Sequence, residues 1–377
     1  MSLKPQANPR CQTPPAGRRR LWLVVAGLAL ALAPALWFRS LASRVSPPAH
    51  HGPSPALPAK SETTPSLAPT QTVHRFASER ASLEPLPLGR RVIRRIIQYG
   101  RGEGEIGLIR KEGQTPVGPE SFALDPKGNL LIADRVNHRV VVYDRNGAAL
   151  KSLEFPGVNL NDLTADDAGR LYVYDQVRST LNQYGPDGRL LSWLNLDPGQ
   201  ISTRGYFHVA RNAVYFADAA QRDVLVGTLE QGILFPPSGL AERASDGVHG
   251  PSGRLYSVAV AKGEGLRLQI RDPDAPSFTR AVELGMPDVL AARYAGEDAA
   301  YRCYVQVERW LGDKVALEVA VFEPDGEPLG STPLPENDYA LWTAKLVEAG
   351  ADGTLVQFLP AEAEARVSLF ETRLATH

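Results

Sequence analysis

Residues 119–155, PESFALDPKGNLLIADRVNHRVVVYDRNGAALKSLEF, decide the fold. Apolar runs too short for helices alternate here with turns rich in Asp, Asn, Pro and Gly, which predicts one four-stranded unit. We expect its strands at 121–124, 129–133, 138–143 and 148–155. A single unit of this kind exposes two sheet edges, so it needs neighbours like itself.

Further copies of the unit follow along the chain. They are expected at 162–196, 205–235, 244–285, 289–334 and 339–374. The turn before the second strand recurs at Gly128, Gly169, Asn212, Gly253, Asp298 and Gly353, at intervals of 41 to 55 residues. That period is typical of four-stranded propeller blades. The similarity weakens toward the C-terminus.

The sixth copy supplies only three strands before the chain ends at His377. The strand-like segment Arg91–Tyr99 is the candidate for the missing outer strand, and it would close the ring without a free sheet edge. The sequence therefore predicts an all-β, six-bladed β-propeller. Five or seven blades stay open as alternatives because the last two copies are irregular.

The first copy resembles an NHL repeat, the unit of six-bladed NHL propellers. The matching elements are Asp125–Gly128, Ile132–Asp134, Asn137–Arg139 and Val142–Asp144, with the glycine-rich approach 99–104 before them. The second copy keeps part of this pattern, and copies four to six lose the aspartate. The resemblance implies a binding scaffold. Some related six-bladed propellers are lyases or metal-dependent lactonases, so it leaves an enzyme open.

The N-terminal segment has a membrane-anchor pattern. Arg18–Arg20 precede the uncharged run Leu21–Phe38, whose 18 residues would span roughly 27 Å as a helix. We expect a cytoplasmic basic tail at 1–20, a transmembrane signal anchor at 21–38, a proline-rich stalk at 39–90 and the propeller at 91–377. The propeller would then be periplasmic or extracellular. Secretion after cleavage of a signal peptide is the alternative.

The charge is distributed unevenly along the chain. Residues 1–61 hold eight basic residues and no acidic one, which leaves 33 basic and 42 acidic residues, a net charge of −9, for the remainder. An acidic body argues against nucleic acid, whose binding needs a basic surface. The membrane and a protein partner or cell-envelope polymer are the expected partners. The two cysteines, Cys11 and Cys303, are too few for a disulfide framework.

Aspartates end the second strand in three successive copies. They are predicted to cap the following turn, and an arginine four or five residues later could return to the same carboxylate. The same turns form our candidate partner-binding face. Its residues are Asp134, Arg135, His138, Arg139, Asp175, Arg178, Asp218 and Arg222.

Two histidines from adjacent copies, His208 and His249, could approach the propeller axis. They are the alternative metal ligands, although zinc needs at least a third ligand. The favoured function is a non-catalytic, membrane-anchored, protein-binding scaffold without a cofactor. The alternative is a metal-dependent hydrolase or lyase with its site at the channel mouth. Trp193, Trp310 and Trp342 are expected in the core between blades.

Overall fold

A computed structural model describes residues 72–75, 88–199, 201, 204–237, 244–261, 265–275, 277–334 and 338–372. These residues form six β-sheets, one per blade of a six-bladed propeller, which confirms the predicted all-β architecture. Within the described part of the chain, no helix has the length and apolar character needed to cross a membrane. The anchor predicted at 21–38 lies outside the described residues.

The first two blades are regular antiparallel sheets, ordered from the inner to the outer strand. Blade 1 contains β3 (Phe122–Leu124), β4 (Leu130–Asp134), β5 (Arg139–Tyr143) and β6 (Ala149–Glu154). Blade 2 contains β7 (Leu160–Ala165), β8 (Leu171–Asp175), β9 (Thr180–Tyr184) and β10 (Leu190–Asn195). The bounds of the four strands of blade 1 lie within one or two residues of the strands predicted for the first copy.

The middle blades depart from the regular unit. Blade 3 contains β11 (Gly205–Ala210), β12 (Ala213–Asp218), β13 (Asp223–Glu230) and β14 (Ile233–Phe235), with β15 (Ala244–Ser245) also paired to β13. Blade 4 contains β16 (Val248–His249), β17 (Leu255–Ala261), β18 (Gly265–Arg271) and β19 (Thr279–Leu284). Its outer edge pairs in parallel with β1 (Thr72–Arg75), a strand inside the predicted stalk. The inner strand of blade 4, β16, is only two residues long.

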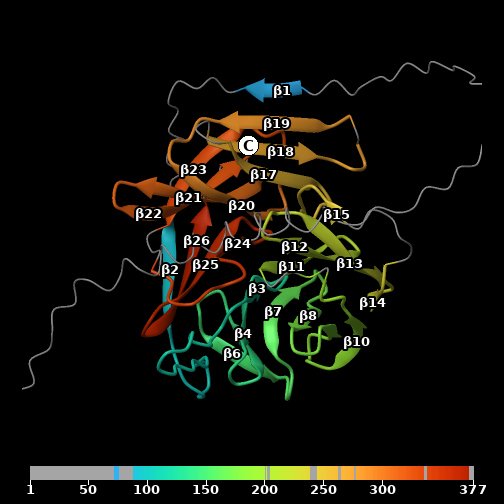
Figure 1. The fold of residues 1–377 in the computed structure, drawn as a ribbon, viewed down its shortest axis with the longest axis vertical. Coiled ribbons are helices and arrows are strands. Elements are labelled where there is room, and N and C mark those ends of the chain that lie inside the picture. The colour runs from blue at the N-terminus through green and yellow to red at the C-terminus, as the bar shows by residue number, and fades with distance from the viewer. Residues whose placement is uncertain are drawn as a thin grey trace, which may run out of the picture. The chain divides into compact units, whose positions relative to one another are not determined.

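The last two blades close the ring. Blade 5 contains β20 (Val289–Glu297), β21 (Cys303–Leu311), β22 (Lys314–Phe322) and β23 (Pro328–Leu334). Blade 6 contains β24 (Val347–Ala349), β25 (Thr354–Pro360) and β26 (Glu364–Thr372), and its outer strand is β2 (Leu88–Gln98). Figure 1 shows β2 beside β26, from opposite ends of the propeller sequence. The predicted closing strand is confirmed by this antiparallel pairing.

The expected role of the tryptophans was wrong. Trp193, Trp310 and Trp342 are 54%, 43% and 47% exposed. Trp193 lies on the outermost strand of blade 2, and Trp310 lies near the tip of the β21–β22 hairpin, paired with Val315. The packing between blades comes instead from smaller aromatic and aliphatic side chains. Fully buried examples are Phe122, Tyr172, Phe207, Tyr256, Tyr304 and Phe358.

Candidate functional site

In blade 1, the aspartate of the predicted partner face is buried and holds the glycine-rich approach in place. Asp134 is 0% exposed and accepts hydrogen bonds from the backbone N–H of Gly107 at 2.8 Å and from Nε of Arg139 at 3.0 Å. Arg139 Nη2 donates to the carbonyl oxygens of Gly102 and Glu105, both at 2.9 Å. These contacts commit the carboxylate of Asp134 and two of the three guanidinium nitrogens of Arg139 to the scaffold.

The same turns in blades 2 and 3 show the capping that the sequence predicts. The carboxylate of Asp175, 0% exposed, accepts bonds from the backbone N–H of Arg178 and from its guanidinium at 2.6 Å. Asp218 accepts two backbone bonds and the fork of Arg222 at 3.0 and 2.7 Å. Here the arginines are the exposed partners, with side chains 58% exposed in both cases.

The two remaining predicted face residues lie in the blade 1 turn. His138 is exposed, has a left-handed backbone with φ of 56°, and its Nδ1 lies 3.0 Å from the carbonyl oxygen of Val158. Arg135 donates from Nη1 to Glu120 Oε1 at 2.8 Å. A binding role for this face stays a prediction. Its reachable groups are His138, Arg178, Arg222 and part of Arg135.

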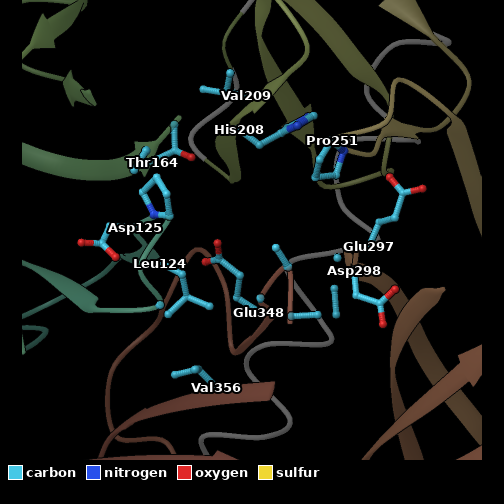
Figure 2. Close-up of a pocket in the computed structure, with 18 of the residues that line it drawn as sticks. Leu124, Asp125, Thr164, His208, Val209, Pro251, Glu297, Asp298, Glu348 and Val356 are labelled. Carbon is cyan, nitrogen blue, oxygen red and sulfur yellow. The ribbon is translucent and has the colours of Figure 1, made fainter. Parts of the chain in front are cut away.

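A cavity lies on the propeller axis and opens at the face opposite the predicted partner-binding face. Its volume is about 1150 Å³, and the turns between the first and second strands of all six blades contribute to its wall. The contributing turn residues include Asp125, Asp166, Arg211, Ser252, Asp298 and Asp352. The predicted face residues do not line it. In Figure 2, side chains from different blades surround the cavity, with His208, Thr164, Glu297 and Glu348 on separate sides.

Two cavity-lining histidines share one buried carboxylate. Asp223, at the start of β13, is 0% exposed, and it bonds His208 Nε2 at 2.8 Å and His249 Nδ1 at 2.9 Å. Burial acts to raise the pKa of Asp223, but the charge of His208 and the hydrogen bonds of both histidines outweigh it, so the pKa lies below its ordinary value. Tyr215 stacks on both imidazoles, with ring centroids 5.6 and 4.4 Å away.

This arrangement differs from the alternative metal site. His208 and His249 do approach one another, as the sequence suggests, but each directs a ring nitrogen at Asp223 over a hydrogen-bond distance. Over the described residues, no group of three or more His, Cys, Asp or Glu side chains has an arrangement that could hold a metal ion.

A lysine lies between several blades at the axis. The side chain of Lys345 is only 9% exposed, pairs with Glu348 at 2.8 Å, and lies 5.5 Å from the ring centroid of Phe122 and 5.9 Å from that of Tyr206. Its charge also acts on the buried Asp162. Burial raises the pKa of Asp162, and the charge of Lys345 opposes that rise only in part.

Three polar groups of the wall have no partner within the described part of the chain. The hydroxyls of Tyr206 and Tyr294 are buried without a hydrogen bond in the described structure, and these residues are 8% and 9% exposed. Arg293, on β20, is half-buried and lines the same cavity, and it has no hydrogen bond or ion pair with any residue that the structure describes. Arg293 is close enough that its charge lowers the pKa of Tyr206, although burial raises that pKa overall.

Sequence reasoning missed Tyr206, Asp223, Arg293 and Lys345. Asp223 opens the apolar strand DVLVGTLE, and Arg293 interrupts the strand VLAARYAGE. A charged residue inside an apolar strand was the available signal, since such a residue is rarely buried without a partner. The signal does not say where the partner lies.

Comparisons with known proteins identify the first repeat and otherwise give distant structural similarities. Residues 117–143 match the family model of the NHL repeat. A hydrazine synthase of Kuenenia stuttgartiensis is 15% identical, with 66% of this chain and 76% of that chain covered and a TM-score of 0.42. A streptogramin B lyase is 11% identical, with 74% and 98% covered and a TM-score of 0.41.

A further match concerns part of the chain only. The transcriptional regulator MraZ of Prosthecochloris aestuarii is 28% identical over 151 residues, which is 34% of this chain and 89% of that protein. At these identities, coverages and TM-scores, none of the three similarities carries an argument about the activity of this chain.

Proposed function

We propose that this chain, a six-bladed β-propeller whose first blade carries an NHL repeat, binds a small polar molecule in its axial cavity without transforming it. The observation that carries the proposal is the cavity itself, about 1150 Å³ in volume and lined from all six blades. Known ligand pockets occupy roughly 300–1,000 Å³, and a few convergent polar groups orient the ligand in them. The unpartnered hydroxyls and Arg293 are such groups.

Two neighbouring alanines at the cavity mouth provide the test. Ala299 and Ala300 are both exposed in the turn after β20, and only Ala299 lines the cavity. Thermal unfolding of the full-length protein is followed with glucose, glucose 6-phosphate, succinate and inorganic phosphate. We expect at least one probe to raise the melting temperature of wild type and of Ala300→Trp but not of Ala299→Trp, because a ligand stabilises only the state it binds.

Two results would contradict the proposal. One is that no probe stabilises wild type at tens of millimolar. The other is that Ala299→Trp keeps the full stabilisation, because the probe would then bind outside the cavity. Folding of both variants is checked by their melting temperature without probe, which should match wild type because both positions are exposed.

A protein-binding role is the second candidate, and apolar side chains on blade 5 favour it. Three apolar side chains are exposed at one end of blade 5, near the turn between its second and third strands. They are Leu290 at 52%, Trp310 at 43% and Leu311 at 45%. Aromatic side chains of this kind are enriched among residues that dominate protein interfaces. The proposed partner is a protein of the cell envelope. In this proposal the run 21–38 anchors an exported propeller to the membrane, where it meets such a protein.

Site-specific photocrosslinking tests this role. A photoreactive residue replaces Trp310, and the control replaces Leu150, which is 52% exposed on the outer strand of blade 1. We expect one discrete adduct from position 310 in cells, none from position 150, and loss of the adduct on adding Leu290→Asp. Equal adducts from both positions would argue against a docking surface on blade 5.

A further inference from the structure

The charged groups around the axial cavity are almost all paired. Among the acids, Asp166 pairs with Arg170, Asp298 with Arg302, Asp352 with Arg145, and Glu348 with Lys345. Glu297 accepts bonds from Ser252 and from the hydroxyl of Tyr256 at 2.6 Å. Asp223 is shared by two histidines. These carboxylates therefore already have partners.

Among the cations that line the cavity, Arg293 is the exception. Arg145, Arg170 and Lys345 pair with the acids named above, and Arg211 pairs with Asp274. Arg293 lies on β20 opposite Gln306 and has no bond within the described residues. A half-buried guanidinium loses part of its hydration, and it regains that energy only from an anion or a set of acceptors.

Two unpartnered donors belong to the same wall. The Tyr206 hydroxyl is buried and feels the charge of Arg293, and the Tyr294 hydroxyl belongs to the residue next to Arg293. Phenolic O–H groups donate well to carboxylate and phosphate oxygens. Buried polar groups in folded proteins nearly always have a partner, so two buried, unpartnered hydroxyls on the wall that also carries Arg293 point to a bound molecule.

The nearby negative charges do not cancel this preference. Asp223, Glu348 and Asp162 all act on Tyr206, but each has its own cationic or hydrogen-bonding partners. The planar fork of an arginine matches two oxygens of one carboxylate or phosphate. The residual chemistry of the wall is therefore that of an anion receptor.

We infer that the axial cavity binds an anionic small molecule, whose carboxylate or phosphate group is held by Arg293 and by the hydroxyl of Tyr206. This inference rests on the proposed function and gives it a ligand class. Tyr294 supplies a second hydroxyl to the same wall. The neutral remainder of the ligand occupies the cavity toward its mouth.

Calorimetric titration of the full-length protein in chloride-free buffer tests the inference. The probes are matched pairs, glucose 6-phosphate against glucose and succinate against succinamide, and inorganic phosphate is added alone. We expect the anion of at least one pair to bind at least tenfold more tightly than its neutral analogue, because the fork makes charge-assisted bonds. The pair that responds distinguishes phosphate from carboxylate.

The decisive variant is Arg293→Gln, with Arg189→Gln as its control. Arg189 is exposed on blade 2 and does not line the cavity. We expect Arg293→Gln to weaken anion binding at least tenfold, Arg293→Lys to restore part of it, and Arg189→Gln to leave it unchanged. Without ligand, Arg293→Gln should melt no lower than wild type, because its guanidinium has no partner to lose. Tyr206→Phe provides an independent loss of binding.

The outcomes separate the inference from the proposed function. Neutral probes that bind as tightly as the anions, with binding blocked by Ala299→Trp, would overturn the anion site and leave the binding function standing. Anion binding that survives Arg293→Gln would also overturn it, because the anion would then be held elsewhere. No binding of any probe at 50 mM would overturn both.

Discussion

Asp134 and Asp223 are equally buried and have opposite uses. Both are 0% exposed, and both accept side-chain and backbone hydrogen bonds. The partner of Asp134 is Arg139, which is always charged, and their pair fixes the segment that leads into blade 1. The partners of Asp223 are His208 and His249, which line the axial cavity.

The difference shows how a repeat separates scaffold from site. Asp134 belongs to the turn pattern shared with Asp175 and Asp218, so its partners are supplied locally in each of these blades. Asp223 stands outside that pattern, and its partners come from β11 and β16 in two adjacent blades. The two histidines of the cavity wall meet at a carboxylate that the repeat does not supply.

The largest expected effect comes from the scaffold aspartate. Asp134→Ala removes the counter-ion of Arg139, whose side chain is 10% exposed, and leaves the Gly107 amide without its acceptor. We expect the free energy of unfolding to fall by about 3–5 kcal/mol, because one charge of a buried pair is left alone. Urea unfolding at pH 7 measures the change.

A double-mutant cycle is the control for that prediction. Arg139→Met added to Asp134→Ala should restore part of the lost stability, because no unpaired charge then remains. A loss below about 1 kcal/mol in the single variant would show that this pair is no stronger than a surface pair.

The second prediction concerns Asp223 and its dependence on pH. Asp223→Asn should lower the free energy of unfolding at pH 7 by about 1.5–3 kcal/mol, because hydrogen bonds to a charged group are lost. A lowered native pKa means that the stabilisation is complete above the ordinary value of 3.8 and disappears as the pH falls below it. Urea unfolding between pH 7 and pH 2.5 should show the two proteins converging at the acid end.

Asp162→Asn provides a control of opposite sign. Burial raises the pKa of Asp162 in the native state, so its ionisation costs stability as the pH rises above 3.8. As the pH rises above 3.8, the free energy of unfolding of wild type should therefore fall relative to that of Asp162→Asn. The prediction for Asp223 would be contradicted if the free energies of unfolding of wild type and Asp223→Asn differed by the same amount at every pH.

Much of the fold could be predicted from the sequence because the repeat is local. The turns at Gly128, Gly169, Gly253 and Gly353 all have positive φ, as a glycine in such turns predicts. In blades 3 and 5 the left-handed residues are Arg211 and Tyr301, not the predicted Asn212 and Asp298. The turn stays in place when glycine is absent, but the residue with positive φ differs. It lies one position before Asn212 in blade 3 and three positions after Asp298 in blade 5.

The site was less predictable because its contacts join distant residues. Asp134 and Arg139 are five residues apart and face each other across one hairpin, so turn chemistry was enough to predict their pairing. His208 and His249 were identified as residues that approach the axis, but the carboxylate between them was not. Arg293 has no partner in the described chain, and no sequence pattern predicts an interaction with a molecule outside it.

The third prediction tests the unpartnered wall. Tyr206→Phe should leave the free energy of unfolding unchanged or raise it by up to about 1 kcal/mol, because a buried hydroxyl without a partner costs stability. Tyr172→Phe is the control, since that hydroxyl donates to Asp166 at 2.8 Å and its loss should destabilise. A clear destabilisation by Tyr206→Phe would show that ordered water already satisfies the hydroxyl.

The smallest expected effect completes the comparison at the surface. Asp218→Ala removes the same turn aspartate as Asp134→Ala, but its partner Arg222 has a side chain that is 58% exposed. Water replaces the lost partner, so we expect the ion pair itself to contribute less than about 1 kcal/mol, and raising the salt from 0.05 to 0.5 M should reduce that contribution. Urea unfolding of Asp218→Ala and Arg222→Met at both salt concentrations measures it. If Asp218→Ala lost as much stability as Asp134→Ala, the burial of the ion pair would not determine its contribution. The geometry of the turn, which both pairs share, would then determine it.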